Sequence, residues 1–72
     1  MNEYTIFFNW DDEASVWIAE CNDLPGLILE SGSFDALVER VKFAVPDLLE
    51  LSEADHAQVK LRIKADRLAV VA

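Results

Sequence analysis

The fold is decided by the stretch Val16-Trp17-Ile18-Ala19-Glu20-Cys21-Asn22-Asp23-Leu24-Pro25-Gly26-Leu27-Ile28-Leu29. It predicts two short apolar strands joined by a bend at Pro25 and Gly26. Proline presets φ for the second position of a type II turn, and glycine accepts the positive φ that follows. Because Leu24 and Leu27 flank the bend, we expect it to lie against a core. The structural turn comprises Asp23, Leu24, Pro25 and Gly26.

The residues before this stretch predict a β-hairpin. Residues 4–10 are rich in aromatic and β-branched side chains, which favour a strand. If the polar residues 11–14 form the loop, the returning strand covers residues 15–21, and Trp10 pairs with Ser15. One face then carries Tyr4, Ile6, Phe8, Trp17, Ala19 and Cys21. The other carries Phe7, Val16 and Ile18, and a slip of one residue would exchange the faces of one strand.

The residues after it predict a third strand and a helix. Residues 27–30 form the strand, antiparallel to the second, and Ser33 is a suitable helix N-cap. Apolar residues then recur at helical spacing and form one buried stripe. Pro46 interrupts this pattern because it lacks a backbone N–H. The helix either kinks there or ends and restarts, and we favour a break. The stripe comprises Phe34, Leu37, Val38, Val41, Val45, Leu48 and Leu49.

A fourth strand follows a linker at residues 52–56. Val59, Leu61 and Ile63 alternate with charged residues over residues 58–64, as in a strand with one buried face. A crossover helix lets this strand lie parallel to the first. The fold class is therefore α+β, in the order β-β-β-α-β, with one mixed sheet covered on one face by a helix. Residues 67–72 are apolar enough for a strand or a dimer contact.

Size and composition indicate one domain, residues 1–72, that needs further stabilisation. A chain of 72 residues buries only about 60% of its unfolded surface. One cysteine excludes an internal disulfide, and Cys21 is expected to be a small buried hydrophobe. Oligomerisation is the remaining source of stabilisation, so we expect a homodimer or a larger homo-oligomer. Without a signal peptide or an apolar run of about 20 residues, a cytoplasmic location is expected.

The charge is unevenly distributed. The net charge is −8, and residues 1–39 contain nine acidic and no basic residues. Such a field repels nucleic acid and membranes and attracts cationic partners. Asp11, Asp12 and Glu13 are candidate contacts to such a partner, although acidic residues also serve solubility alone.

Motifs for catalysis, phosphate binding or metal binding are not recognisable, so no catalytic, cofactor-binding or metal-binding residue is assigned and an enzyme is not expected. His56 is interpreted as a surface histidine. The basic residues Lys60, Arg62 and Lys64 are better explained by carboxylates across the sheet, such as Glu3 or Glu20, than by nucleic acid.

The predicted open face of the sheet is a more useful feature. One helix covers one face, whereas Phe7, Val16 and Ile18 fall on the other. Apolar surface of this kind on a small protein usually marks contact with another chain. These three residues are the candidate partner contact.

Several segments together resemble the N-terminal domain of HicB antitoxins, and most closely their small stand-alone relatives of unknown function. The resemblance rests on the segments Trp10-Asp11-Asp12-Glu13-Ala14, Val16-Trp17-Ile18-Ala19 and Asp23-Leu24-Pro25-Gly26-Leu27 and on the helix after Ser33. It implies a partial ribonuclease H fold. HicB proteins bind and silence HicA, a small basic ribonuclease toxin, so the resemblance also implies a partner of that kind.

Two departures from the family bear on function. A DNA-binding domain is not expected, because the chain stops at Ala72, and the carboxylate set of ribonuclease H is not recognisable. The favoured interpretation is an acidic, antitoxin-like interaction module. A stand-alone structural homo-oligomer with no toxin partner remains open, as does a degenerate metal nuclease.

Overall fold

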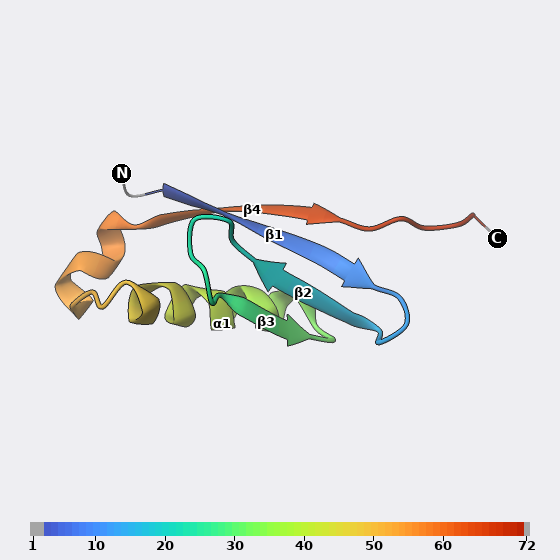
Figure 1. The fold of residues 1–72 in the computed structure, drawn as a ribbon, viewed down its shortest axis with the longest axis horizontal. Helices are drawn as coiled ribbons and strands as arrows, with labels where there is room; N and C mark the ends of the chain where they lie inside the picture. The colour runs from blue at the N-terminus through green and yellow to red at the C-terminus, as the bar shows by residue number, and fades with distance from the viewer. Residues whose placement is uncertain (1–2, 72) are drawn as a thin grey trace.

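The structure, a computed structural model, describes residues 3–71, and it describes residues 53 and 57 by their backbone alone. Six elements follow one another along the chain (Figure 1). They are β1 (Glu3–Asp11), β2 (Val16–Glu20), β3 (Ile28–Ser31), α1 (Phe34–Leu48), the 3-10 helix η1 (Glu53–Gln58) and β4 (Lys60–Asp66).

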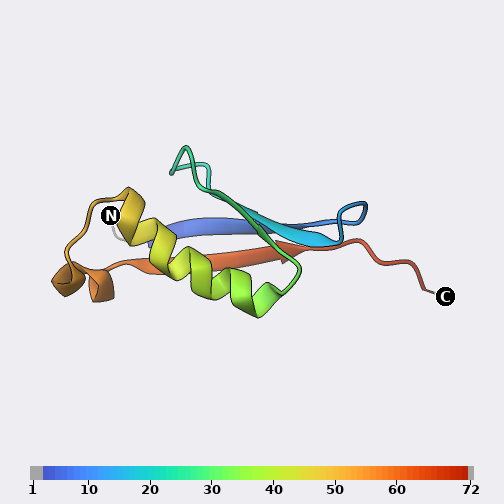
Figure 2. The ribbon, with the colours of Figure 1, turned by 90° about the horizontal axis from the view of Figure 1, so that it is seen from below.

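The four strands form one mixed sheet in the order β3-β2-β1-β4. β2 is antiparallel to β1 and to β3, whereas β4 is parallel to β1. A parallel neighbour requires the chain to cross back over the sheet, and α1 and η1 make that crossing (Figure 2). The predicted α+β class and the parallel placement of the fourth strand are confirmed.

The hairpin register differs from the prediction by two residues. Trp10 pairs with Trp17 rather than with Ser15, and Asp11 still belongs to β1, opposite Val16. The reason lies in the turn, where Asp11 Oδ1 accepts hydrogen bonds from the backbone N–H groups of Glu13 at 3.1 Å and of the next residue at 3.2 Å. This closes the turn one residue later than expected. Because the shift is even, every side chain keeps its predicted face.

The turn at Pro25 and Gly26 has the predicted geometry. The backbone N–H of Leu27 donates to the carbonyl of Leu24 at 3.1 Å, and Gly26 has φ +95°. Leu24 and Leu27 are both buried, whereas Asp23 is exposed. The bend therefore rests on the core through the leucines on either side of it.

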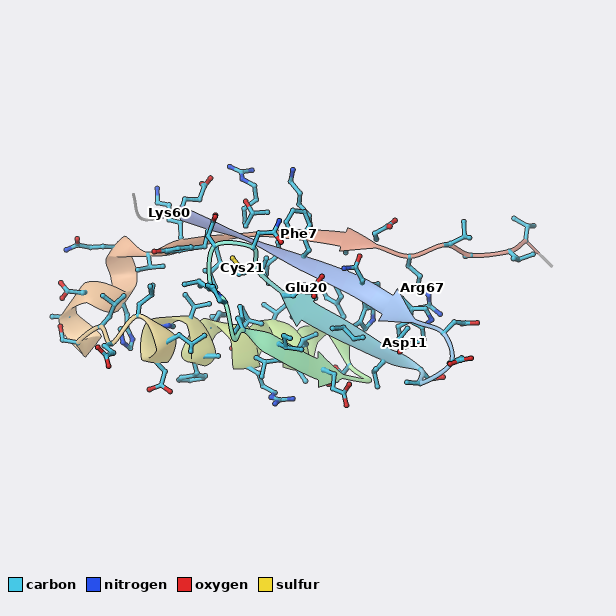
Figure 3. The ribbon with its side chains drawn as sticks, viewed as in Figure 1. Phe7, Asp11, Glu20, Cys21, Lys60 and Arg67 are labelled. Atoms are coloured by element: carbon cyan, nitrogen blue, oxygen red, sulfur yellow. The ribbon has the colours of Figure 1, made fainter. Side chains whose placement is uncertain are left out.

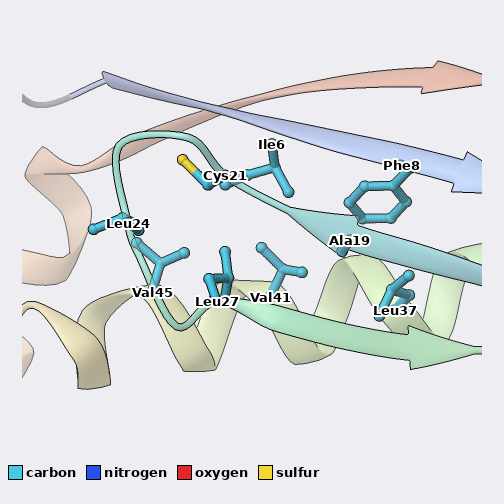
Figure 4. Close-up of a cluster of buried hydrophobic side chains, with 9 residues drawn as sticks. All are labelled: Ile6, Phe8, Ala19, Cys21, Leu24, Leu27, Leu37, Val41 and Val45. Atoms are coloured by element: carbon cyan, nitrogen blue, oxygen red, sulfur yellow. The ribbon is translucent and has the colours of Figure 1, made fainter.

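The core lies between α1 and the sheet face that carries Ile6 and Phe8 (Figure 4). The helix presents Leu37, Val41 and Val45 to that face at consecutive turns. Ser33 caps its start, accepting from the N–H of Ala36 at 3.2 Å. Among the described residues, nine buried hydrophobic side chains form this core: Ile6, Phe8, Ala19, Cys21, Leu24, Leu27, Leu37, Val41 and Val45.

The preferred break at Pro46 is wrong, since α1 runs through it to Leu48. Proline has a helical φ, and its missing N–H removes one hydrogen bond to the preceding turn without ending the helix. The helix ends in a Schellman motif. Leu51 N–H donates to the carbonyl of Pro46 at 3.0 Å and Glu50 N–H to that of Asp47 at 3.1 Å, with Glu50 at φ +54°.

Two further details differ from expectation. The predicted linker at residues 52–56 forms most of η1, which extends to Gln58, so the fourth strand begins at Lys60 and not at residue 58 as predicted. The N–H of Asp55 donates to the carbonyl of Ser52 at 3.0 Å in this helix. Leu48, placed on the buried helix stripe, is 46% exposed, whereas the next residue, Leu49, packs against the core.

Replacing Gly26 with alanine should lower the free energy of unfolding by about 1 kcal/mol, because an L side chain resists positive φ. A Cβ at Gly26 would meet no atom within 4 Å, so crowding plays no part. Gly32→Ala is the matched control, since its Cβ would make only an ordinary 3.7 Å contact. Urea denaturation of both variants measures the difference, and equal losses would contradict the turn assignment.

Replacing Glu50 with glycine should raise the free energy of unfolding by about 1 kcal/mol, because it relieves positive φ at the helix end. Ala36→Gly, at an exposed position inside α1, should instead lower it by about 1 kcal/mol. Thermal denaturation compares the two variants. A loss of stability in Glu50→Gly would show that the Schellman motif is absent in solution.

Candidate interaction surface

The sheet has one face covered by α1 and one face on which no element of the described residues 3–71 lies (Figure 2). The register decides which side chains reach this open face, because directly paired residues point to the same side. Phe7 pairs with Glu20 of β2 and with Lys64 of β4, and Glu20 pairs in turn with Ile28 of β3. These four form one row across the sheet.

Four apolar residues of the open face form what we call the open-face strip: Phe7, Val16, Ile18 and Ile28. Val16 and Ile18 are alternate residues of β2, and Phe7 lies diagonally from Ile18 on β1. Phe7, Val16 and Ile18 are half-buried by their neighbours, whereas Ile28 is 69% exposed. The structure thus places the three predicted contact residues together and adds a fourth from β3.

Carboxylates surround the strip on the β2 and β3 side. Glu20 is paired with both Phe7 and Ile28, and Glu30 is paired with Ile18 (Figure 3). Asp11 is paired with Val16 at the hairpin end of the strip. Each apolar side chain of the strip therefore has an acidic cross-strand neighbour, and this half of the face carries no basic strand residue.

Basic residues occupy the opposite edge of the same face. Lys60, Arg62 and Lys64 alternate along β4 and are exposed. Arg62 forms a two-pronged contact with Glu3, Nε and Nη2 each lying 3.4 Å from one carboxylate oxygen. The expected pairing with Glu3 is confirmed. The open face is thus divided into an acidic half over β2 and β3 and a basic edge along β4.

The hairpin carboxylates have local roles besides their charge. Asp11 holds the turn, as described above, and Asp12 Oδ1 accepts a hydrogen bond from Trp10 Nε1 at 3.1 Å. Asp12 and Glu13 are exposed and stand at the end of the strip. The predicted acidic contact group is therefore adjacent to the apolar contact group, and two of its three members also shape the turn.

An aromatic cluster that the sequence did not predict lies on the covered face, where it runs from Phe8 through Phe34 and Trp17 to Trp10. Neighbouring ring centroids are 4.9, 5.1 and 5.4 Å apart, at angles that favour edge-to-face contact. The guanidinium of Arg67 lies 4.0 Å from the Trp10 ring centroid. Arg67 is thereby held against the body just after β4 ends, at the same end of the sheet as Asp11 (Figure 3).

An apolar groove lies between α1 and the first half of β4. It has a volume of about 660 Å³ and exists because one helix does not span four strands. Its apolar lining comes from Val38, Phe43 and Pro46 of the helix and from Val59, Leu61 and Ile63 on the β4 side. His56 also borders it, together with Glu39 and Lys42.

Among the side chains that the structure describes, no three His, Cys, Asp or Glu residues gather as a metal ion requires. Within residues 3–71, no helix is long and apolar enough to cross a bilayer.

Comparison with known proteins places the chain in a family. The crystal structure of a hypothetical protein, TTHA1013, from the extremely thermophilic bacterium Thermus thermophilus superposes with a TM-score of 0.74. The two sequences are 35% identical, and the match covers 96% of this chain and 99% of that one. No curated protein matches. Residues 3–72 match the family described as a domain of unknown function, DUF1902, and the chain therefore belongs to that family.

Proposed function

We propose that this protein is an antitoxin-like binding module whose open face holds a small basic protein. The observation that carries the proposal is the open-face strip with its acidic neighbours. Apolar residues supply contact area, and Glu20, Glu30 and Asp11 beside them supply charge that selects a cationic surface. In this proposal the protein acts by binding and not as an enzyme.

The geometry explains why the partner should be basic rather than merely apolar. Placed face to face, two copies of the acidic half would bring like charges together, which costs free energy. A cationic partner removes that repulsion and neutralises the carboxylates when they lose water. The acidic hairpin at the end of the strip extends the same field and would speed the encounter.

The resemblance to HicB supports the same conclusion and suggests the class of partner. A HicA-type toxin is a small basic ribonuclease, so it has the charge that this face would select. The segments that carry the resemblance include β2 with Val16 and Ile18, and the turn that positions β3. We therefore propose neutralisation of such a toxin as the biological role.

One observation favours the alternative of a structural homo-oligomer without a toxin. The residues after β4 are apolar and almost fully exposed, Leu68 at 94% and Val71 at 97%. This segment lies outside the open-face strip. Self-association through it is therefore compatible with a basic partner on the open face, and both can be tested separately.

The test of the binding role uses the tagged protein to retain proteins from its own cells at low salt. We expect a small basic protein to be retained and to be released between about 50 and about 300 mM salt, because screening weakens charge contacts. Ile18→Lys should reduce its affinity about tenfold or more, since it places a cation within the acidic half. Ala54→Lys makes the same change of charge on exposed η1 and should have little effect.

A charge-only variant refines the test. Glu20→Gln and Glu30→Gln together should slow association and flatten its dependence on salt, whereas Glu50→Gln at the helix end should not. If the parent protein retains no more basic protein than Ile18→Lys does, the proposal is contradicted, provided that circular dichroism shows both proteins folded.

A further inference from the structure

The outer edge of β4 pairs with no strand among the described residues. β4 follows β1 for seven pairs, from Glu3 with Lys60 to Asn9 with Asp66, and is the last strand of the sheet. Its other edge therefore presents unpaired backbone donors and acceptors, which make an edge strand a template for another strand.

The segment that continues β4 is unusual for a protein surface. Residues 67–71, which we call the arm, run straight on from the sheet and beyond it (Figure 1). Leu68, Val70 and Val71 are 94%, 91% and 97% exposed. Only the first residue is anchored, by the contact of Arg67 with Trp10. The arm is not part of a strand in this structure, and from Leu68 to Val71 it is an apolar segment left exposed by the described residues 3–71.

We propose that two copies of this chain pair their β4 strands and arms antiparallel about a two-fold axis, with Ala65 opposite the partner's Ala65. The two sheets then become one sheet of eight strands, and both α1 helices lie on the same face. The inference concerns the β4 edge and stands independently of the proposed binding of a basic protein by the strip.

Charge selects this register. With Ala65 on the axis, Lys64 lies opposite the partner's Asp66, and the same pair occurs a second time by symmetry. Arg62 and Lys60 then lie opposite the apolar side chains of the partner's Leu68 and Val70. Moving the axis to residue 64 or 62 places like basic residues opposite each other, and moving it to residue 66 opposes two aspartates, which is unfavourable.

The lysines of β4 therefore restrict the pairing rather than prevent it. Cations on an edge strand normally discourage association. Here the same strand carries one acid, Asp66, at the position that matches Lys64 when Ala65 is on the axis. Of the axis positions from residue 60 to residue 67, all of which keep both helices on one face, residue 65 is the position that leaves no like charges opposed.

The other face of the paired strands meets the apolar groove. By strand alternation, Ala69 and Val71 of the arm point to the side of α1, as Arg67 does. In this register the partner's Ala69 lies opposite Leu61, and the partner's Val71 lies opposite Val59. Both of these residues line the groove between α1 and β4, so the arm of one copy covers the open side of the other's groove.

A second copy is a better occupant than the arm's own chain. The groove lies beside the start of β4, next to η1, and the arm leaves from the other end of the strand (Figure 1). An arm that continues β4 therefore moves away from its own groove. An antiparallel partner reverses this direction and brings its arm to that groove.

The register predicts a charge-swap result in analytical ultracentrifugation of the full chain. The parent should form a dimer of the 8.1 kDa chain. Lys64→Asp and Asp66→Lys, made singly, should each raise the dimer dissociation constant about tenfold, because each opposes like charges twice. The double variant exchanges the two charges of each pair, so its dimer dissociation constant should return to within about threefold of the parent's.

Two further variants test the same arrangement. Deletion from Leu68 onward, which keeps Arg67 on Trp10, should abolish the dimer and leave the circular dichroism spectrum of the fold. Ala65→Cys should form a disulfide-linked dimer on mild oxidation, because directly opposed Cα atoms of antiparallel strands lie about 4.5–5.5 Å apart, within the range of about 4.4–6.8 Å that a disulfide spans. Ala14→Cys, in the exposed hairpin turn, is the matched control for random collision.

Three results would count against the proposed pairing. A parent that sediments as a monomer at every concentration would overturn the proposal, as would a double variant no better than the single ones. Equal cross-linking of the variants at Ala65 and Ala14 would show that β4 is not the contact. None of these outcomes touches the open-face strip, so the binding of a basic protein stands or falls by its own test.

Discussion

Pairing of β1 with both β2 and β4 is the constraint on which the rest of the structure depends. β1 holds the centre of the sheet and supplies Ile6 and Phe8 to the core. Because β4 is parallel to β1, the chain must cross from β3 to the far edge, and α1 makes that crossing over one face. The single α-helix of the described residues 3–71 covers one face only, and it does not reach β4 fully. The open face and the groove are both consequences of this topology.

The charges are arranged on those two exposed features in different ways. Carboxylates adjoin the open-face strip on β2 and β3, where they favour a cationic partner. β4 carries the cations together with Asp66, a pattern that matches a second, reversed copy of itself. In the two proposals, one sheet would offer its acidic half to another protein and its β4 edge to a second copy, a division that the net charge of −8 does not show.

Residues with a strong local preference made much of the fold predictable from the sequence. Pro25 and Gly26 specify their turn by backbone geometry, and the alternation around Leu61 specifies which face of β4 is buried. The predicted hairpin register was wrong because it depends on which backbone N–H groups donate hydrogen bonds to Asp11. Loops of several lengths are compatible with the same pattern of apolar and polar residues. Pro46 was misjudged because a proline removes one backbone hydrogen bond to the preceding turn without having to end the helix. The stacking of Arg67 on Trp10 joins distant residues and leaves no periodic signal.

Residue-resolved amide hydrogen exchange, measured at two protein concentrations on either side of the dimer's dissociation constant, tests the central claim most directly. The claim is that self-association uses the β4 edge and leaves the open face available. We predict that raising the concentration slows exchange within residues 59–71 and leaves Phe7, Val16 and Ile18 unchanged. Slower exchange at those three residues, with none along β4 and the arm, would contradict it, because copies would then meet through the open face.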